Sequence, residues 1–399
     1  MFPISVPAAA TTDSYVLDPA RLRRCKAAYT TRAVPLESLP QPVGLTRDTV
    51  PRPGGLVLAR VEEVGHHTRL ELPEGRRATL FAGDEIVVAY GSRYAPDQFE
   101  AYVPADVGEC HLVAAGGLAA RAVSQHQGMR PPTRLTPLGL LADGQGRVVN
   151  TADYASQPAT GTPVAARPLT VAVVGTSMNA GKTTTAASLV RGLSRAGYTV
   201  GAAKVTGTGA GGDRWLLRDA GAERVLDFTD AGYVSTYQLA PPAVLGVMRS
   251  LVGSLASGGA QAIVVEVADG LLQSETAALV ADPGFAELTD GVIFAAGDAL
   301  SAVAGTARLR RLGVEPCAVS GLLTASPLAA REARGQVDLP VVEPHELCEP
   351  VTACRLTATM SPAAGSGNLD GTAAGAGGPG ELAVEAAVSA APGAMEAVA

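Results

Sequence analysis

The residues of this chain that are best suited to chemistry lie in Gly175-Thr-Ser-Met-Asn-Ala-Gly-Lys-Thr183. A loop of small residues lets backbone N–H groups surround an oxyanion, because glycine places no Cβ in the way. A lysine at the end of such a loop can bridge the β- and γ-phosphates of a nucleotide, and the next threonine hydroxyl can bind Mg²⁺. We therefore predict a phosphate-binding loop that contains Lys182 and Thr183.

The strand and helix patterns that flank this loop fit the motif, but the spacing of its glycines does not. An apolar strand precedes it and a helical pattern follows it, as the motif requires. However, five residues rather than four separate Gly175 from Gly181, and counting from Thr176 restores the spacing but loses the glycine. The alternative is an ordinary glycine-rich turn between a strand and a helix. We expect nucleotide contacts from Gly175, Thr176, Asn179, Ala180, Gly181, Lys182, Thr183 and Thr184.

Lysine is rare in this chain, since only three of the 31 basic residues, Lys26, Lys182 and Lys204, are lysines. Two of the three lie in the candidate nucleotide domain. Lys182 is in the loop and Lys204 directly follows the next predicted strand. At such places a compact ammonium does chemistry that a planar guanidinium cannot copy. The alternative for Lys204 is a lysine that merely extends from a strand end into solvent.

Residues 168–348 alternate strand and helix patterns, which predicts an α/β fold with a mostly parallel, doubly wound sheet. In such sheets the ligand lies beyond the carboxyl ends of the strands. Polar residues follow several of these strands, namely Lys204, Glu266, Asp298 and Thr324. We predict strands at 169–174, 198–204, 262–267, 291–296, 316–322 and 338–342, with helices such as 242–255 and 299–312.

The rest of the chain has a different pattern. Residues 48–150 contain short alternating segments separated by Gly and Pro, which is typical of a small antiparallel β-barrel-like domain. We interpret the adjacent His66 and His67 as a solvated turn rather than a metal site, because neighbouring side chains point apart. Residues 1–47 are expected to be irregular. Residues 151–167 are expected to be a linker and residues 349–399 a disordered, low-complexity tail.

Composition favours a soluble, cytoplasmic protein with two domains. The 399 residues exceed what one core usually organises, and no apolar run approaches the length of a membrane span. No secretory signal follows Met1. The net charge of −7 argues against a nucleic-acid binder, which would need a basic surface. The five cysteines form no CxxC pair, which is typical of reduced thiols.

Three stretches, in order and correctly spaced, resemble dethiobiotin synthetase and its relatives among the P-loop amide-forming and carboxylating enzymes. The loop at 175–183 is similar to that family's Gly-Thr-Asp-x-x-x-Gly-Lys-Thr. Lys204-Val-Thr-Gly-Thr-Gly is similar to its Lys-Pro-Val-x-Ser-Gly, and Val265-Glu-Val-Ala-Asp-Gly270 to its Val-Glu-Gly-Ala-Gly-Gly. The resemblance covers about residues 168–345 and not the amino-terminal part.

This chain departs from that family at a few positions. Ser177 stands where the family has Asp, and Val267 and Asp269 replace glycines. These changes affect the expected substrate more than the expected nucleotide. A P-loop domain of unknown function that is linked to D-amino-acid catabolism has the same loop type. Asp230-Ala-Gly-Tyr-Val-Ser resembles one of its segments more weakly.

The resemblance implies ATP and Mg²⁺ as cofactors and Lys182 and Lys204 as catalytic residues. Lys204 would face the transferred phosphoryl group and the substrate's carboxylate or carbamate. Thr183, Asp213 and Glu266 would bind the metal, since Mg²⁺ prefers hard oxygen ligands. The alternative for Asp213 is a solvated loop acid. We also expect Asp269, Asp298 and Thr324 to lie behind these residues or to contact the base.

The main functional hypothesis is a Mg-ATP-dependent enzyme that transfers a phosphoryl group to activate a small carboxylate or carbamate for ligation or ring closure. The alternative is a SIMIBI-type regulatory or metallochaperone NTPase that acts on a protein partner. A third hypothesis is a binding module without turnover, because Ser177 replaces an acid. The chain has no Asn-Lys-x-Asp motif, which favours ATP over GTP. We expect a small anionic substrate and no nucleic-acid or membrane partner, and a homodimer is left open.

Overall fold

The computed structural model describes residues 15–156 and 167–360. These residues form two compact units. The β-rich unit contains the described residues up to Ser156 and, in addition, two later segments, Thr208–Gly211 and Thr229–Tyr237. The parallel-sheet unit contains the rest of the described chain. The predicted division at residues 151–167 alone does not account for the two later segments, which belong to the first unit.

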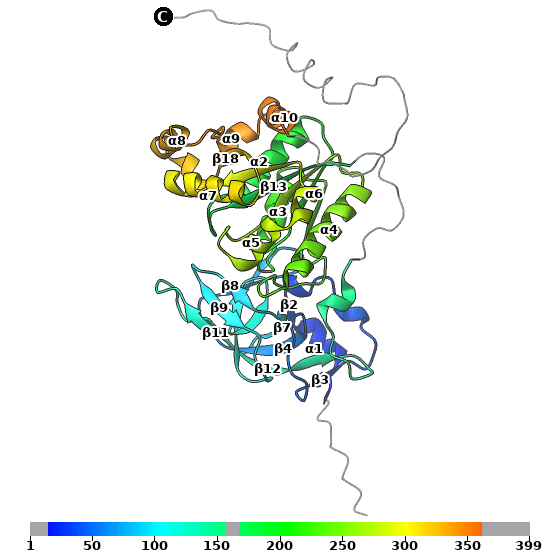
Figure 1. Cartoon of the computed structure of the whole chain (residues 1–399). Coiled ribbons are helices and arrows are strands. Elements are labelled where there is room, and N and C mark those ends of the chain that lie inside the picture. Colours follow the sequence, from blue (N-terminus) through cyan, green and yellow to red (C-terminus); the bar gives the residue numbers. More distant parts are fainter. Residues whose placement is uncertain (1–14, 157–166, 361–399) are drawn as a thin grey trace, which may run out of the picture. The chain divides into compact units, whose positions relative to one another are not determined.

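The strands of the β-rich unit are short and mostly antiparallel, as the alternating segments predicted (Figure 1). They are β1 (Tyr15–Val16), β2 (Lys26–Ala27), β3 (Gly44–Thr46), β4 (Leu56–Glu63), β5 (Arg69–Glu71), β6 (Arg77–Thr79), β7 (Glu85–Tyr90), β8 (Arg93–Tyr94), β9 (Phe99–Tyr102), β10 (Cys110–Ala114), β11 (Leu118–Gln125) and β12 (Thr133–Ala142). One short helix, α1 (Pro19–Arg24), precedes β2.

Five of these strands close into a barrel. β12 pairs with β4, β4 with β7, β7 with β11, β11 with β10, and β10 with β12 again. Only the β7–β11 step of this ring is parallel. Alternate residues point inward along a strand, and Val57, Ile86, Val88, Leu112 and Leu135 belong to one buried cluster. The barrel-like fold expected for this region is therefore confirmed.

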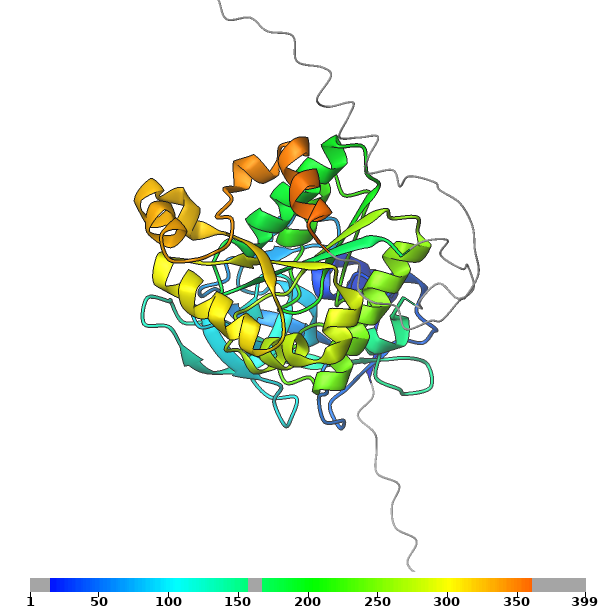
Figure 2. The same cartoon turned by 45° about the horizontal axis from the view of Figure 1, so that its top comes forward.

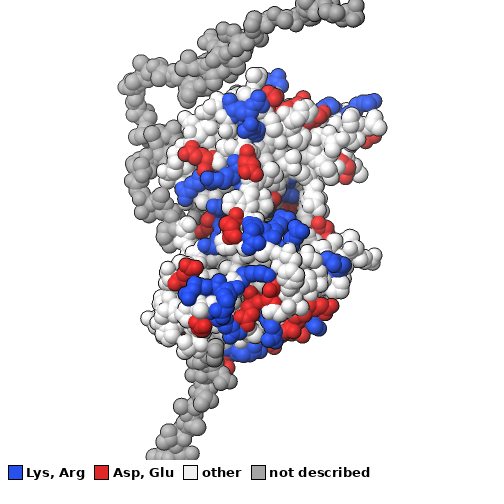
Figure 3. Space-filling view, turned by 180° about the vertical axis from the view of Figure 1, so that it is seen from behind, with Lys and Arg blue, Asp and Glu red and all other residues white. Residues whose placement is uncertain are grey.

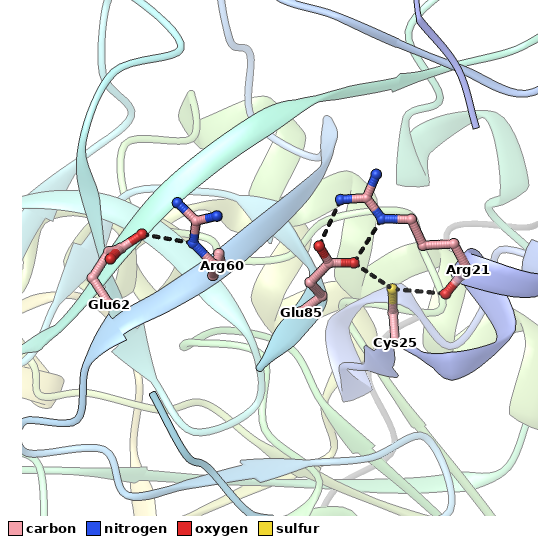
Figure 4. A network of polar contacts seen from close by, with 5 residues as sticks. All are labelled: Arg21, Cys25, Arg60, Glu62 and Glu85. Carbon is pink, nitrogen blue, oxygen red and sulfur yellow. Dashed lines mark hydrogen bonds and ion pairs between the residues drawn. The ribbon is translucent and has the colours of Figure 1, made fainter. Parts of the chain in front are cut away.

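The segment that was expected to be irregular belongs to this sheet in its described part. β3 pairs with β12, and β2 pairs with β7. Figure 4 shows how α1 is attached, with the Arg21 guanidinium on Glu85 of β7 at 2.6 Å and the Cys25 thiol beside the same carboxylate. Burial, followed by the charge of Glu85, raises the pKa of Cys25 to about 11, so this thiol stays protonated.

The expectation of a solvated turn at the paired histidines was wrong for one of them. His67 is buried, and its Nε2 lies 3.2 Å from Nη1 of the buried Arg93. Burial lowers the pKa of His67 to about 3, so the ring is neutral. Sequence alone does not reveal such a tertiary pair, because His67 and Arg93 are 26 residues apart.

The parallel-sheet unit alternates strands and helices. Its strands are β13 (Leu169–Gly175), β14 (Val200–Lys204), β15 (Arg224–Asp227), β16 (Ala262–Glu266), β17 (Gly291–Ala295) and β18 (Pro316–Ser320). Its helices are α2 (Lys182–Arg195), α3 (Gly212–Asp219), α4 (Pro241–Ser257), α5 (Ser274–Ala281), α6 (Pro283–Leu288), α7 (Ala299–Arg311), α8 (Pro327–Arg334), α9 (Pro344–Leu347) and α10 (Pro350–Ala358).

The six strands run parallel in the order β15-β14-β16-β13-β17-β18, which confirms the predicted α/β fold class. One predicted strand is wrong. Residues 338–342 make only an isolated bridge through Val341, and Pro340 lacks the N–H that a regular ladder needs. The sixth strand is instead β15, which is only four residues long and was not predicted.

Helices cover both faces of this sheet (Figure 2). One buried cluster joins alternate residues of the central strands, such as Val171 and Val173, to Leu189 of α2, Leu217 of α3 and Leu356 of α10. On the other face α4 packs on β14, β15 and β16. Part of the predicted tail is therefore a packed helix, and residues 361–399 lie outside the described residues.

Charged side chains of both signs are present on the surface of the protein. On the face that Figure 3 shows, basic and acidic side chains are interspersed in small groups rather than separated by sign. No helix among the described residues is long and apolar enough to cross a membrane. All five cysteines are free.

Candidate functional site

The predicted phosphate-binding loop connects β13 to α2, as its motif requires. Gly175 ends β13, and a Cβ there would lie 2.7 Å from Cγ of Lys182 and 2.8 Å from the carbonyl oxygen of Ala295. Gly181 caps α2 with φ of +90°, a left-handed conformation that glycine adopts without strain. The two glycines therefore let the lysine side chain fold back over its own loop.

Three neighbouring strand ends hold the loop through its backbone. Thr176 N–H donates to Ala295 of β17 at 3.0 Å, and Leu271 N–H donates to the Gly175 carbonyl at 3.1 Å. On the far side, Leu322 N–H donates to the Ala180 carbonyl at 2.9 Å. The loop is thus held by tertiary hydrogen bonds with the last residue of β17 and with the segments that follow β16 and β18. Thr184, on α2, and Asn179, in the loop, are exposed.

Lys182 is nearly buried, with 5% of its surface exposed. Its Nζ donates a 2.7 Å hydrogen bond to the Ser177 carbonyl, inside the loop. Burial lowers the pKa of Lys182, and the charges of Glu266 and Asp269 act in the opposite direction. The loop therefore places a desolvated ammonium where it would compensate an anion strongly.

Thr183 and Glu266, two of the three predicted metal residues, are in direct contact. The Thr183 hydroxyl donates to Glu266 Oε1 at 2.8 Å. Glu266 ends β16 and is 2% exposed. Its Oε2 is buried and has no hydrogen-bond partner among the described residues. A buried carboxylate oxygen without a partner is costly, which suggests that it binds a group absent from the protein alone.

Lys204 and Asp213 form an ion pair in which Nζ donates to Oδ2. Lys204 ends β14, directly opposite Glu266 in the sheet register, and Asp213 lies in the first turn of α3. Burial alone lowers the pKa of Lys204, but Asp213 and Glu266 outweigh it and raise this pKa, so the ammonium stays charged. The alternative of a solvated lysine does not hold, since only 14% of this side chain is exposed.

The third predicted metal residue, Asp213, therefore contacts Lys204 rather than Thr183. It still belongs to the same electrostatic cluster, because its charge acts on both Glu266 and Lys182. Burial raises the pKa of Glu266, Lys204 lowers it, and Asp213 raises it further. The structure thus brings the predicted site residues Lys182, Thr183, Lys204, Asp213 and Glu266 into one cluster.

Asp269, Asp298 and Thr324 were expected to lie behind the site residues or to contact the base. Their positions in the structure differ. Asp298 is exposed, and its carboxylate caps α7 by accepting from Ser301 N–H at 2.8 Å. Thr324 donates to the Gly321 carbonyl at 2.7 Å. These two have local structural roles. Asp269 acts electrostatically on both lysines and has φ of +62°, which is unusual for a residue with a side chain.

Sequence reasoning missed one acidic residue. Asp227 is 3% exposed and ends β15, directly opposite Lys204 in the register. The signal was a polar residue after the short apolar pair Val225-Leu226, which follows the same rule that selected Lys204 and Glu266. It was overlooked because β15 itself was not predicted.

Comparisons with known proteins give a limited result. No protein-family model and no curated protein matches this sequence. Among solved structures, the signal recognition particle receptor FtsY from Elizabethkingia anophelis is 18% identical with a TM-score of 0.31, and the match covers 47% of this chain and 60% of that one. FtsY from Mycoplasma mycoides is 16% identical with a TM-score of 0.33, covering 48% and 68%.

A third similar structure is the signal recognition particle 54 kDa protein from Aeropyrum pernix K1 in complex with GDP. It is 17% identical with a TM-score of 0.26, and the match covers 53% of this chain and 45% of that one.

Proposed function

We propose that this protein is a Mg²⁺-dependent nucleoside triphosphatase, with ATP preferred, that works as a switch acting on a protein partner. The observation that carries this proposal is the hydrogen bond from Thr183 to Glu266 beside the phosphate-loop lysine, with the buried Oε2 of Glu266 left without a partner. Thr183 and Glu266 would hold the metal, and Lys182 would bind the phosphates.

The donor atoms fit Mg²⁺. This ion takes oxygen ligands and is usually held by one or two carboxylates together with substrate phosphates and water. Held by Thr183 and Glu266, Mg²⁺ would supply positive charge that neutralises the charge developing on the phosphate. Because burial raises the pKa of Glu266, metal affinity should fall as the pH is lowered.

The two lysines would have different roles. Lys182 donates to Ser177 within the loop, so its ammonium is already held where phosphate oxygens would bind. Lys204 is fixed and charged at the carboxyl end of β14 by Asp213. A fixed cation stabilises charge that develops in the transition state without reorganising. Lys182 would therefore determine binding, and Lys204 would determine turnover.

One observation favours a switch over a small-molecule enzyme. A small-molecule enzyme could use the glycine-rich loop after Lys204 to close on its substrate if that loop were free to move. Instead Gly209 and Gly211 are buried, and Gly209 N–H donates to Val234 at 2.9 Å within the β-rich unit. A loop held in this way is poorly suited to act as a substrate lid.

The second candidate is the ATP-dependent activation of a small carboxylate or carbamate. Its support is the threefold resemblance to dethiobiotin synthetase and the position of Lys204 at the carboxyl edge of the sheet. In that case the small anionic substrate would accept the phosphoryl group beside Lys204. The protein would then be a ligase or phosphotransferase.

Phosphate release separates these candidates. The protein is incubated with Mg²⁺ and either ATP or GTP, with and without a panel of small carboxylates and amines. A separate light-scattering measurement gives the mass of the protein and would detect a homodimer. Slow release that no small molecule stimulates supports the switch, and release stimulated by a carboxylate supports the second candidate. Tighter binding of GTP would contradict the ATP preference. No release and no nucleotide binding would contradict both candidates.

A further inference from the structure

Within the parallel-sheet unit, the turn that follows β16 lies directly against the phosphate-binding loop. A Cβ on Gly270 would lie 2.2 Å from the carbonyl oxygen of Thr176 and 2.7 Å from Cα of Ser177. One residue later, Leu271 N–H donates to the Gly175 carbonyl at 3.1 Å. The absence of a side chain at Gly270 therefore lets the backbone of the turn touch the backbone of the loop.

The start of this turn is fixed as well. The Ala268 carbonyl accepts a hydrogen bond from the Thr276 hydroxyl at 2.8 Å and another from the Thr206 hydroxyl at 3.1 Å. Both threonines are buried, Thr276 in α5 and Thr206 in the segment that follows β14. Asp269 thus lies between two anchored neighbours, Ala268 and Gly270.

Asp269 itself has a backbone conformation that is unusual for a residue with a side chain. Its φ is +62°, in the left-handed region. Such a conformation persists only where the surrounding structure imposes it, and it occurs often at functional sites. Asp269 is half-buried, whereas Ala268 and Gly270 on either side of it are buried. The turn therefore presents one partly exposed acidic residue next to the loop, at a cost in backbone strain.

The charge of Asp269 acts on both lysines of the site. Burial lowers the pKa of Lys182, and the charges of Glu266 and Asp269 oppose this effect. Burial acts in the same direction on the pKa of Lys204, but Asp213, Glu266 and Asp269 together outweigh it. A phosphate held by these two ammonium groups would therefore have the Asp269 carboxylate as a neighbour.

We infer that Asp269 is a catalytic residue that binds the attacking water and accepts its proton during nucleotide hydrolysis. This inference rests on the proposed function and deepens it. The water oxygen forms a bond to the terminal phosphorus while the bond from that phosphorus to the bridging oxygen breaks, which yields a nucleoside diphosphate and inorganic phosphate. The proton passes from the water to the Asp269 carboxylate and then to solvent. A carboxylate on a fixed turn can hold the water in place without reorganising.

The test compares Asp269→Asn with the wild type. Phosphate release is followed in single turnovers with protein in excess, and calorimetry measures the binding of a non-hydrolysable ATP analogue with Mg²⁺. Asparagine has a similar shape and tolerates the left-handed region, so the turn is preserved. We expect the rate of phosphate release to fall about 100-fold, as for the loss of a general base. The affinity for the analogue should not fall, because the variant removes a negative charge beside the phosphates.

Two glycine variants separate the carboxylate from the backbone. Asp269→Gly accepts the left-handed conformation without strain, and glycine is the residue that the similar dethiobiotin synthetase stretch has at this position. We expect the same loss of rate as in Asp269→Asn, and this variant replaces the asparagine variant if that one does not fold. Gln238→Gly is the matched control. Gln238 has φ of +68° and lies in the same unit before α4, so its replacement should leave the rate unchanged.

The outcomes separate this inference from the proposed function. A rate close to that of the wild type in Asp269→Asn or Asp269→Gly would overturn the inference and leave the proposed function intact. An equal loss of affinity and rate would also overturn it, because it would indicate a role in binding. The same holds for an equal loss of rate in Gln238→Gly. If the wild-type protein releases no phosphate from ATP or GTP, the proposed function fails, and this inference fails with it.

Discussion

The Thr183 hydroxyl donates a 2.8 Å hydrogen bond to Oε1 of Glu266, a residue 83 positions away in the chain. The bond links the first turn of α2 to the carboxyl end of β16 and uses only one of the two carboxylate oxygens. A hydroxyl and a carboxylate held together beside a buried lysine form a small oxygen-rich site.

Glu266→Gln should strongly reduce the Mg²⁺ dependence of nucleotide binding, because a neutral amide oxygen lacks the negative charge of the carboxylate. The amide oxygen can still accept from Thr183, so the fold is preserved. Calorimetry with an ATP analogue in EDTA and in Mg²⁺ measures the effect. Retention of the full Mg²⁺ effect would show that Glu266 is not a metal residue.

The stability of the Glu266→Gln variant relative to the wild type should depend on pH. Burial raises the pKa of Glu266 above its ordinary value of 4.5, so the folded protein holds this proton more tightly than the unfolded chain does. The contribution of Glu266 to stability is therefore largest below about pH 4.5 and is lost as the pH rises through the raised pKa. Without ligand, Glu266→Gln should exceed the wild type in melting temperature by more at pH 8 than at pH 5. An equal difference at both values would contradict the raised pKa.

Lys182→Ala should abolish measurable nucleotide binding and leave the fold intact. A desolvated ammonium compensates phosphate charge at short range, and no other side chain in the described loop can replace it. Binding is measured by calorimetry and folding by circular dichroism. Lys26→Ala is a suitable control, because Lys26 pairs with Asp84 in the β-rich unit. Unchanged turnover in Lys182→Ala would end the phosphate-loop interpretation.

Lys204→Ala should lower turnover on the order of 10²–10³-fold, as for the loss of one preorganised electrostatic donor, with a much smaller change in nucleotide affinity. Lys204→Arg should not restore turnover, because the broad guanidinium does not fit a point contact beside Asp213. Steady-state kinetics and calorimetry separate the two effects. Full turnover in Lys204→Ala would exclude a role in phosphoryl transfer.

Gly181→Ala should destabilise the protein more than Gly197→Ala and also remove nucleotide binding. Both glycines are left-handed, with φ of +90° and +92°, so each alanine carries a cost of about 1 kcal/mol. A Cβ on Gly197 meets nothing within 4 Å, whereas one on Gly181 would lie 2.8 Å from Leu322 N. Urea unfolding compares the two variants. If both variants lose the same free energy of unfolding, the loop at Gly181 can shift to accept a side chain.

The sequence by itself determined the features that local patterns encode. The glycines, the lysine and the threonine of the loop, the five longer strands and the polar residues at their ends were all predictable, because strand and helix periodicity and turn chemistry act over a few residues. This is why Lys204 and Glu266 were found before their neighbours were known. The strand at β15 was missed because four residues give too weak a local signal.

Tertiary structure alone decided which of these residues meet. It joined Thr183 to Glu266 and Lys204 to Asp213, and it placed Gly211 against Glu71, which is 140 positions earlier in the chain. It also made the glycine-rich segment Thr208–Gly211 a part of the β-rich unit. Such pairings depend on sheet order and on backbone approach between distant segments, and neither leaves a periodic signal in the chain.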